Sequence, residues 1–180
     1  MNTSLPKISK ILLSAESIRN RVTELAAQIN RDYQDVDQLI LIGILRGAFI
    51  FVADLARQLQ ITHSVDFMAL ASYEKNVSTG EVRILLDLRE PIHDQHVLIV
   101  EDILDSGETL NYLYRNLIER KPASIRTCVL VKKQRGTLNS QVRVDYLGFE
   151  IPNVWVVGYG LDYANYYRTL PYIAELEIPQ

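Results

Sequence analysis

Three carboxylates and a run of small residues follow one short apolar segment of the sequence. Residues 97–100 predict a buried strand, and Glu101, Asp102 and Asp105 come directly after it. Residues 106–109 then open a predicted helix, whose free N–H groups and positive dipole end can hold a phosphate. Carboxylates just upstream suit sugar hydroxyls or a hard cation such as Mg²⁺. An N-cap with two solvated acids is the plainer interpretation, but acids clustered after an apolar strand are costly unless they are partnered.

Strands alternating with helices must position this segment. A continuous apolar run of a few residues is typical of a parallel strand that is covered on both faces. Such patterns predict strands over residues 39–45, 65–71, 82–86, 97–100, 125–131, 142–147 and 154–157, and helices over 47–60 and about 109–120. Ser14 is a candidate N-cap for a further helix, with Ile18, Val22, Leu25, Ala26 and Ile29 on one face. We therefore predict an α/β fold with a mostly parallel central sheet flanked by helices, which binds its ligand at the carboxyl ends of the strands.

Length and composition set limits on the class of protein. The chain has 180 residues, 48% of them hydrophobic and 23% charged, which predicts one folded domain over residues 1–180. A net charge of −3 disfavours general binding of nucleic acid. Cys128 is the single cysteine and fits a reducing compartment. The longest apolar run is too short to cross a bilayer and no targeting segment is visible, so we expect a cytoplasmic protein without a membrane partner.

Four segments, in order, resemble the motifs of one family. Residues 101–109 closely resemble the phosphoribosyl-diphosphate motif of type I phosphoribosyltransferases, in their hypoxanthine-guanine branch. Residues 45–47 resemble the pyrophosphate loop, residues 65–73 with 78–80 the strand and flexible lid, and residues 148–163 the purine-binding hood. The resemblance spans roughly residues 7–177. It implies the type I fold, with a small hood over the C-terminal edge of the sheet, formed by the N-terminal segment and roughly residues 148–180.

The resemblance also implies a reaction and a set of roles. The chain would transfer 5-phosphoribosyl from phosphoribosyl diphosphate to N9 of hypoxanthine or guanine, with Mg²⁺ as cofactor and a homodimer or homotetramer as the assembly. Asp105 would be the general base on the purine, and Glu101 and Asp102 would hold the ribose hydroxyls. The other implied contacts are Ser106, Gly107, Glu108 and Thr109 for the 5′-phosphate; Arg46, Gly47 and Arg168 for pyrophosphate; Ser72 and Tyr73 for the lid; Lys132, Trp155, Val156 and Asp162 for the purine; and Glu101, Asp102 and Asp162 for the metal.

Three residues depart from the family pattern, and one of them is Trp155, where the family normally has phenylalanine. Arg46 stands where the family usually has lysine, so the positive charge is kept but is carried by a planar guanidinium group. The family has a cis peptide before that position, which we carry over to Leu45–Arg46 as an expectation. Glu108 places an acid beside the phosphate loop, and we expect its side chain to turn to solvent.

Several alternatives remain open at this point. Lys132 could belong to a solvated basic run, and Trp155 could be a core residue. A regulatory RNA-binding protein on the same fold is a rival from another class, although it would need a basic face. An enzyme for another base, such as xanthine, is a nearer rival. The ammonium of Lys132 can only donate, which favours a 6-oxo group over the amino group of adenine.

Overall fold

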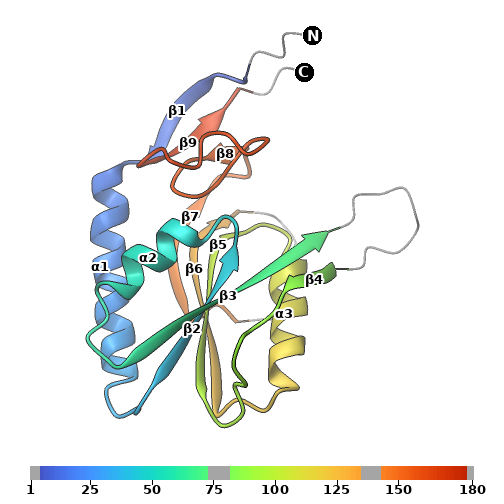
Figure 1. The fold of residues 1–180 in the computed structure, drawn as a ribbon. Helices are drawn as coiled ribbons and strands as arrows, with labels where there is room; N and C mark the ends of the chain where they lie inside the picture. The colour runs from blue at the N-terminus through green and yellow to red at the C-terminus, as the bar shows by residue number, and fades with distance from the viewer. Residues whose placement is uncertain (1–4, 73–81, 135–142, 178–180) are drawn as a thin grey trace.

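A twisted six-stranded sheet forms the body of the molecule, and a smaller sheet lies beyond one end of it (Figure 1). The computed structural model describes residues 5–72, 82–134 and 143–177. The large sheet has the strand order β4-β3-β2-β5-β6-β7. Its strands are β2 (Leu39–Leu45), β3 (His63–Ser72), β4 (Val82–Leu86), β5 (His96–Leu104), β6 (Ser124–Lys133) and β7 (Tyr146–Ile151). All neighbours are parallel except β3 and β4, so five strands end at one edge. The predicted α/β fold with a mostly parallel sheet is confirmed.

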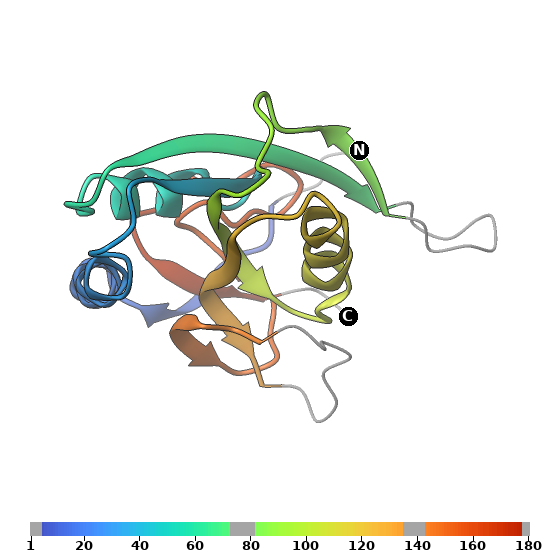
Figure 2. The same cartoon turned by 90° about the horizontal axis from the view of Figure 1, so that it is seen from below.

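Helices cover both faces of this sheet. Helices α1 (Ala15–Asp32) and α2 (Phe49–Ala56) pack on one face and α3 (Glu108–Ile118) on the other, as Figure 2 shows from below. Strand β5 serves both layers, because successive side chains of a strand point to opposite faces. Leu98 and Val100 join the core under α1 and α2, whereas Val97 and Ile99 join the core under α3. This double burial explains why residues 97–100 of the strand are all apolar.

Helix α1 begins as the sequence predicts. The Ser14 hydroxyl accepts a hydrogen bond from the Ser17 N–H at 3.1 Å, which satisfies one of the free donors of the first turn. The buried side chains of the helix are the predicted face: Ile18, Val22, Leu25, Ala26 and Ile29. Within the described residues, no helix is long and apolar enough to cross a membrane.

A three-stranded antiparallel sheet, which we call the hood, lies beyond the carboxyl ends of the parallel strands (Figure 1). It consists of β1 (Ile8–Leu13), β9 (Ile173–Leu176) and β8 (Val156–Val157), in the order β1-β9-β8. The two ends of the chain therefore meet in one small sheet. The N-terminal segment joins the C-terminal part of the chain there, as the resemblance implies.

Several predicted boundaries were wrong. Strand β5 runs on to Leu104 and so carries the first two acids within the strand rather than after it. Strand β6 likewise continues to Lys133, two residues beyond the predicted end, while β7 begins only at Tyr146. Helix α2 is shorter than the predicted span of residues 47–60. Hydrogen bonding to neighbouring strands, which the local sequence does not encode, continues β5 through Glu101 and Asp102 and β6 through its two terminal lysines.

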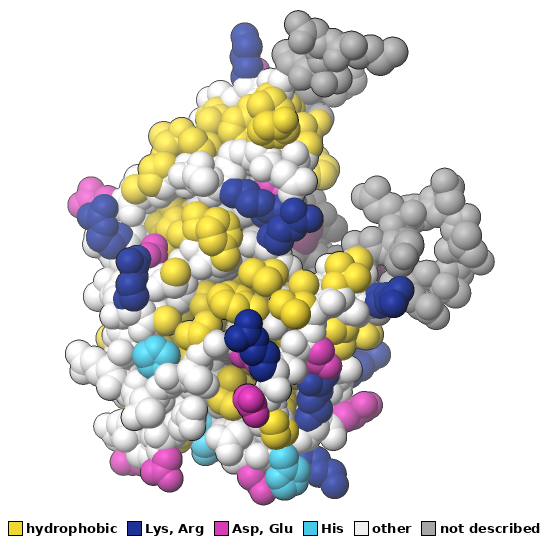
Figure 3. Space-filling model, in the orientation of Figure 1, with side chains coloured by type: hydrophobic (Ala, Val, Ile, Leu, Met, Phe, Trp, Pro, Cys, Tyr) yellow, Lys and Arg dark blue, Asp and Glu magenta, His cyan; other side chains and the backbone are white. Residues whose placement is uncertain are grey.

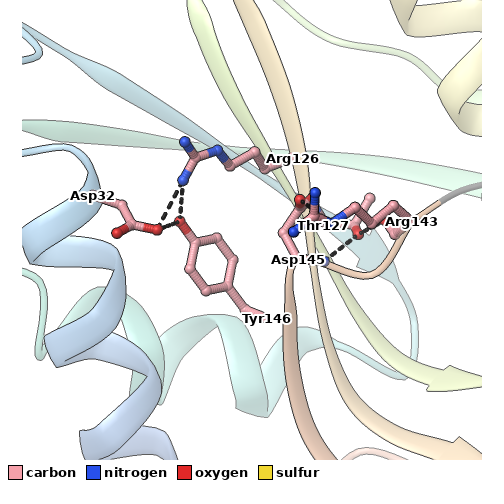
Figure 4. A network of polar contacts seen from close by, with 6 residues as sticks. All are labelled: Asp32, Arg126, Thr127, Arg143, Asp145 and Tyr146. Atoms are coloured by element: carbon pink, nitrogen blue, oxygen red, sulfur yellow. Dashed lines mark hydrogen bonds and ion pairs between the residues drawn. The ribbon is translucent and has the colours of Figure 1, made fainter.

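At the opposite end of the sheet, a polar network joins α1 to β6 and β7 (Figure 4). The Tyr146 hydroxyl donates to Asp32 Oδ2 at 2.7 Å, and Arg126 Nη1 lies 2.8 Å from the same oxygen. The Arg126 guanidinium also stacks over the ring of Tyr33, 5.1 Å from its centroid. The network fixes the last turn of α1 against the amino ends of the strands, away from the edge that carries the expected site.

Candidate active site

The expected site lies where the neighbouring strands β2 and β5 end. After β2 the chain turns to α2 on one face of the sheet, and after β5 it turns to α3 on the other. Such a divergence leaves a crevice at the carboxyl ends of two adjacent strands, the usual ligand position in open α/β sheets. In Figure 3, basic side chains gather where the hood meets the body of the molecule.

The segment between β2 and α2 runs very close to β5. The peptide bond Leu45–Arg46 is cis, as the resemblance implies. A Cβ atom added to Gly47 would lie 1.6 Å from Asp102 Oδ2, so no larger residue fits there without displacing that carboxylate. Arg46 is exposed beside it. The predicted pyrophosphate loop and the predicted ribose acids are therefore brought into direct contact.

The two adjacent acids of β5, Glu101 buried and Asp102 half-buried, are both disfavoured as anions. Glu101 is 7% exposed, and its Oε2 has no hydrogen-bond partner within the described part of the chain. Burial, with the neighbouring Asp102 charge, raises the pKa of Glu101 well above its usual value. Burial likewise raises the pKa of Asp102 to about 6, although backbone N–H groups and the charge of Arg168 act against the rise. Two such carboxyls suit ligands that bring hydroxyl donors or a cation.

Helix α3 begins at the expected phosphate loop. Gly107 has φ 85°, a left-handed conformation that favours glycine, and it stands at the N-cap position. The Ser106 hydroxyl accepts from the Glu108 N–H at 3.3 Å. The Glu108 side chain is exposed, as predicted, and Thr109 is half-buried in the first turn.

Asp105 is held by a lysine that the sequence reasoning missed. Lys133 Nζ lies 3.1 Å from Asp105 Oδ2, and the same ammonium lies 5.9 Å from the centroid of the Trp155 ring. Lys133 is 8% exposed, whereas Trp155 is 61% exposed and is therefore not a core residue. One buried cation thus joins the predicted general base to the predicted stacking surface.

Lys132, the residue that we expected to contact the purine, has a different partner. Its Nζ lies 3.2 Å from Glu150 Oε1 on the neighbouring strand β7. Because β6 continues through Lys133, consecutive side chains point to opposite faces, and the structure does not bring Lys132 to Asp105. The sequence offered one signal for this. Because side chains alternate along a strand, only one of two adjacent lysines can face Asp105.

The hood and the segment that joins β8 to β9 supply further predicted contacts. Val156 is buried in β8, next to Trp155. Arg168 Nη2 lies 2.7 Å from Asp162 Oδ1, and Asp162 Oδ2 accepts from the Asn165 N–H at 2.7 Å, so both carboxylate oxygens have protein partners. Of the expected lid residues, Ser72 is the last residue of β3, and Tyr73 lies outside the described residues.

Comparison with known proteins gives the class of protein. The family model of the phosphoribosyl transferase domain matches residues 9–164, nearly nine-tenths of the chain. The chain therefore belongs to the phosphoribosyl transferase family, and its α/β fold and its site at the ends of β2 and β5 agree with that membership.

Particular relatives narrow the class. The chain is 45% identical over 172 residues to the hypoxanthine-guanine phosphoribosyltransferase of Dictyostelium discoideum, covering 93% of this chain and 95% of the relative. It is 47% identical over 176 residues to the enzyme of the same name from Mycobacterium tuberculosis, covering 94% and 87%. The structure of Trypanosoma cruzi hypoxanthine phosphoribosyltransferase in complex with its product IMP superposes with a TM-score of 0.87, at 43% identity and 97% coverage of both chains.

Proposed function

We propose that this chain is a purine salvage enzyme, which transfers the 5-phosphoribosyl group of phosphoribosyl diphosphate to N9 of hypoxanthine and guanine. The products are IMP or GMP and pyrophosphate. The observation that carries this proposal is that Lys133 contacts both Asp105 and Trp155. These residues lie close to the start of α3, which has Gly107 as its N-cap, on the fold of this family. The names of the relatives support the same reaction.

The arrangement suits displacement at the anomeric carbon of a sugar. Such reactions pass through an oxocarbenium-like state, so catalysis rests on stabilising the leaving group and holding the nucleophile in line. Asp105 takes the proton that leaves the purine ring, at N7. The Lys133 ammonium, 3.1 Å from Asp105 Oδ2, keeps the Asp105 carboxylate oriented toward the purine.

The purine is read by Lys133 rather than by Lys132. The Lys133 ammonium is a pure donor, which matches the exocyclic O6 of a 6-oxopurine and not the amino group of adenine. The exposed indole of Trp155 offers a face on which the ring stacks. Backbone groups at Val156 and the Asp162 carboxylate complete the recognition of the ring edge, the latter accepting from N2 of guanine.

Two loops, residues 106–109 and the pyrophosphate loop, bind the phosphate groups of the substrate. The N–H groups of residues 106–109 hold the 5′-phosphate, and the left-handed Gly107 lets the backbone approach it. Arg46, the Gly47 backbone and Arg168 bind pyrophosphate. Ser72 and Tyr73 lead a lid that excludes water from the oxocarbenium.

Mg²⁺ is the proposed cofactor, and the acids of β5 fit it. In the described parts of the chain, no three His, Cys, Asp or Glu side chains are grouped so as to hold a metal ion by themselves. Mg²⁺ usually takes only one or two carboxylates and completes its shell with substrate oxygens and water. Glu101, with its unpartnered Oε2, and Asp102 are such donors, whereas Asp162 already has partners for both oxygens. When bound, Mg²⁺ neutralises charge on the diphosphate.

Removal of Mg²⁺ is therefore expected to stop the reaction. Neutralisation of a leaving group is worth several kcal/mol, so EDTA should lower the rate of nucleotide formation by at least about 100-fold. The measurement is a rate assay in EDTA followed by titration with MgCl₂. Asp102→Asn should shift the half-saturating Mg²⁺ concentration upward. Full activity in EDTA would show that the acids serve the ribose hydroxyls alone.

A panel of bases tests the function itself. The purified protein is incubated with Mg²⁺, phosphoribosyl diphosphate and each of hypoxanthine, guanine, xanthine, adenine and uracil, and the nucleotide formed is measured. We expect product from hypoxanthine and guanine and none from adenine or uracil. Product mainly from xanthine, or from adenine or uracil, would replace the proposed base specificity. No product from any base would favour the RNA-binding regulator on the same fold.

The setting of the enzyme is also proposed. We infer that it works in the cytoplasm, because its one cysteine, Cys128, is buried and unpaired. We infer a homodimer or homotetramer and small-molecule substrates, with no nucleic-acid or membrane partner. One domain over residues 1–180, with the hood built from both ends of the chain, fits this assignment.

A further inference from the structure

The segment that carries Arg168 is a compact loop closed by backbone hydrogen bonds. We call residues 158–170 the hood loop. The Tyr159 N–H donates to the Leu170 carbonyl and the Gly160 N–H to the Arg168 carbonyl, both at 2.8 Å. Three consecutive residues, Gly158, Tyr159 and Gly160, have positive φ values, so the chain turns sharply at the start of the loop. The beginning and the end of the loop are thereby held together.

One side chain at this turn reaches across to helix α2. The Tyr159 hydroxyl donates to Asp54 Oδ2 at 2.6 Å. Tyr159 is 6% exposed, and burial raises the pKa of its hydroxyl, which therefore stays protonated and able to donate. The Asp54 side chain is 32% exposed and also pairs with Arg57, the residue that follows the helix. The hood loop is thus attached to α2 by a hydrogen bond between a buried donor and a charged acceptor.

The next residue of the loop lies directly on the pyrophosphate loop. A Cβ atom added to Gly160 would lie 1.9 Å from the Gly47 carbonyl oxygen, so the two backbones are in contact. Helix α2 begins at Phe49, two residues after Gly47. Adjacent residues of the hood loop therefore contact one continuous unit, consisting of the pyrophosphate loop and the helix that follows it.

Arg168 depends on this contact for its direction. Its Nη1 donates to the Gly160 carbonyl at 2.7 Å, while its own carbonyl accepts from the Gly160 N–H. The guanidinium is therefore held within the hood loop, by the Gly160 carbonyl and by the Asp162 carboxylate. The neighbour of Gly160, Tyr159, is bonded to α2. The purine contacts Lys133 and Trp155 lie on β6 and just before β8, so they do not depend on the hood loop in this way.

We propose that Tyr159 and Asp54 are positioning residues, whose hydrogen bond fixes the hood loop on α2 and so directs Arg168 toward the pyrophosphate group. This inference rests on the proposed phosphoribosyl transfer and adds to it a pair of residues outside the site. It predicts that loss of the hydrogen bond weakens the pyrophosphate half of the substrate site and leaves the contacts of Lys133 and Trp155 with hypoxanthine intact.

Tyr159→Phe is the direct test, because it removes the hydroxyl and keeps the buried ring. The free energy of a hydrogen bond to a charged group corresponds to a change of about tenfold in an equilibrium constant, here the binding constant of the diphosphate substrate. We expect KM for phosphoribosyl diphosphate, and KM for pyrophosphate in the reverse reaction, to rise by about that factor. KM for hypoxanthine and kcat should change less than about twofold. Asp54→Asn should act in the same direction, and the double variant should be no worse than Tyr159→Phe alone.

Two control variants separate positioning from general stability. Tyr146→Phe removes the same kind of bond, a tyrosine hydroxyl on an aspartate that also pairs with an arginine, at the far end of the sheet (Figure 4). Arg57→Gln removes the exposed ion pair on Asp54 and leaves the Tyr159 contact. Thermal unfolding is measured for each variant. Both controls should leave the two KM values for the diphosphate substrates unchanged.

Amide hydrogen exchange gives a readout that needs no catalysis. In Tyr159→Phe, peptides covering residues 158–170 should exchange faster, and peptides from β6 should not. In an active protein, an unchanged KM for phosphoribosyl diphosphate, or an equal rise for hypoxanthine, overturns the inference. If the wild-type protein makes no nucleotide, the proposed function fails, and unchanged exchange of the hood loop separately overturns its attachment by Tyr159.

Discussion

Asp105→Asn is expected to lower kcat for IMP formation by about 10²–10⁴, the usual contribution of a positioned general base. Asparagine keeps the shape of the side chain and an oxygen that can accept from Lys133 Nζ, but it cannot take a proton from the purine. The loss should therefore appear in kcat, with KM for both substrates nearly unchanged. Steady-state kinetics of the forward reaction measure it.

The folded state of this variant has to be checked independently. Its thermal unfolding temperature and its affinity for IMP should stay close to those of the wild-type protein, since neither depends on proton transfer. A kcat equal to that of the wild-type protein would remove Asp105 from the mechanism. A loss shared by kcat and IMP affinity would instead assign Asp105 to binding.

The second large effect separates two adjacent lysines. We expect Lys133→Met to raise KM for hypoxanthine about 10–100-fold, because it removes a charged donor to O6, and such bonds contribute about 1.5–3 kcal/mol. KM for phosphoribosyl diphosphate should rise less than about threefold by comparison. Kinetics with each substrate varied in turn make the measurement.

Lys132→Met is the matched control for this prediction. It deletes the same charge one residue earlier, where the ammonium pairs, among the residues that the structure describes, with the half-exposed Glu150. Exposed ion pairs contribute about 0–1 kcal/mol to stability, so both KM values should stay within about twofold of wild type. The reverse pattern, with the purine effect at Lys132, would restore the assignment that the sequence suggested.

The fold could largely be predicted from the sequence, because its strands are buried on both faces. The apolar run of residues 39–45 predicts β2 with the bounds that the structure has, and the start and face of α1 are confirmed. These features depend on local pattern and capping. The strand ends were less predictable, because β5 continues through the acids Glu101 and Asp102 and β6 ends in two lysines, and both are held by pairing with neighbouring strands.

The site was predictable where one segment carries several residues. Residues 101–109 lie together in the sequence, and the structure keeps them together around the start of α3. The contact of Asp105 with Lys133 rather than Lys132 was not predicted, because it depends on how far β6 continues. The hydrogen bond between Asp54 and Tyr159 joins residues that are far apart in the chain, so no local sequence pattern predicts it.

The contact of three backbone segments at Gly47 limits how this enzyme can change. On one side Gly47 faces the Asp102 carboxylate, and on the other its carbonyl touches Gly160. A methyl group added at either glycine collides with a different segment, so neither position can be varied alone. A larger residue at position 47 would need a compensating change at Asp102, and one at position 160 would need a shift of the Gly47 backbone, so a library of single substitutions should recover neither.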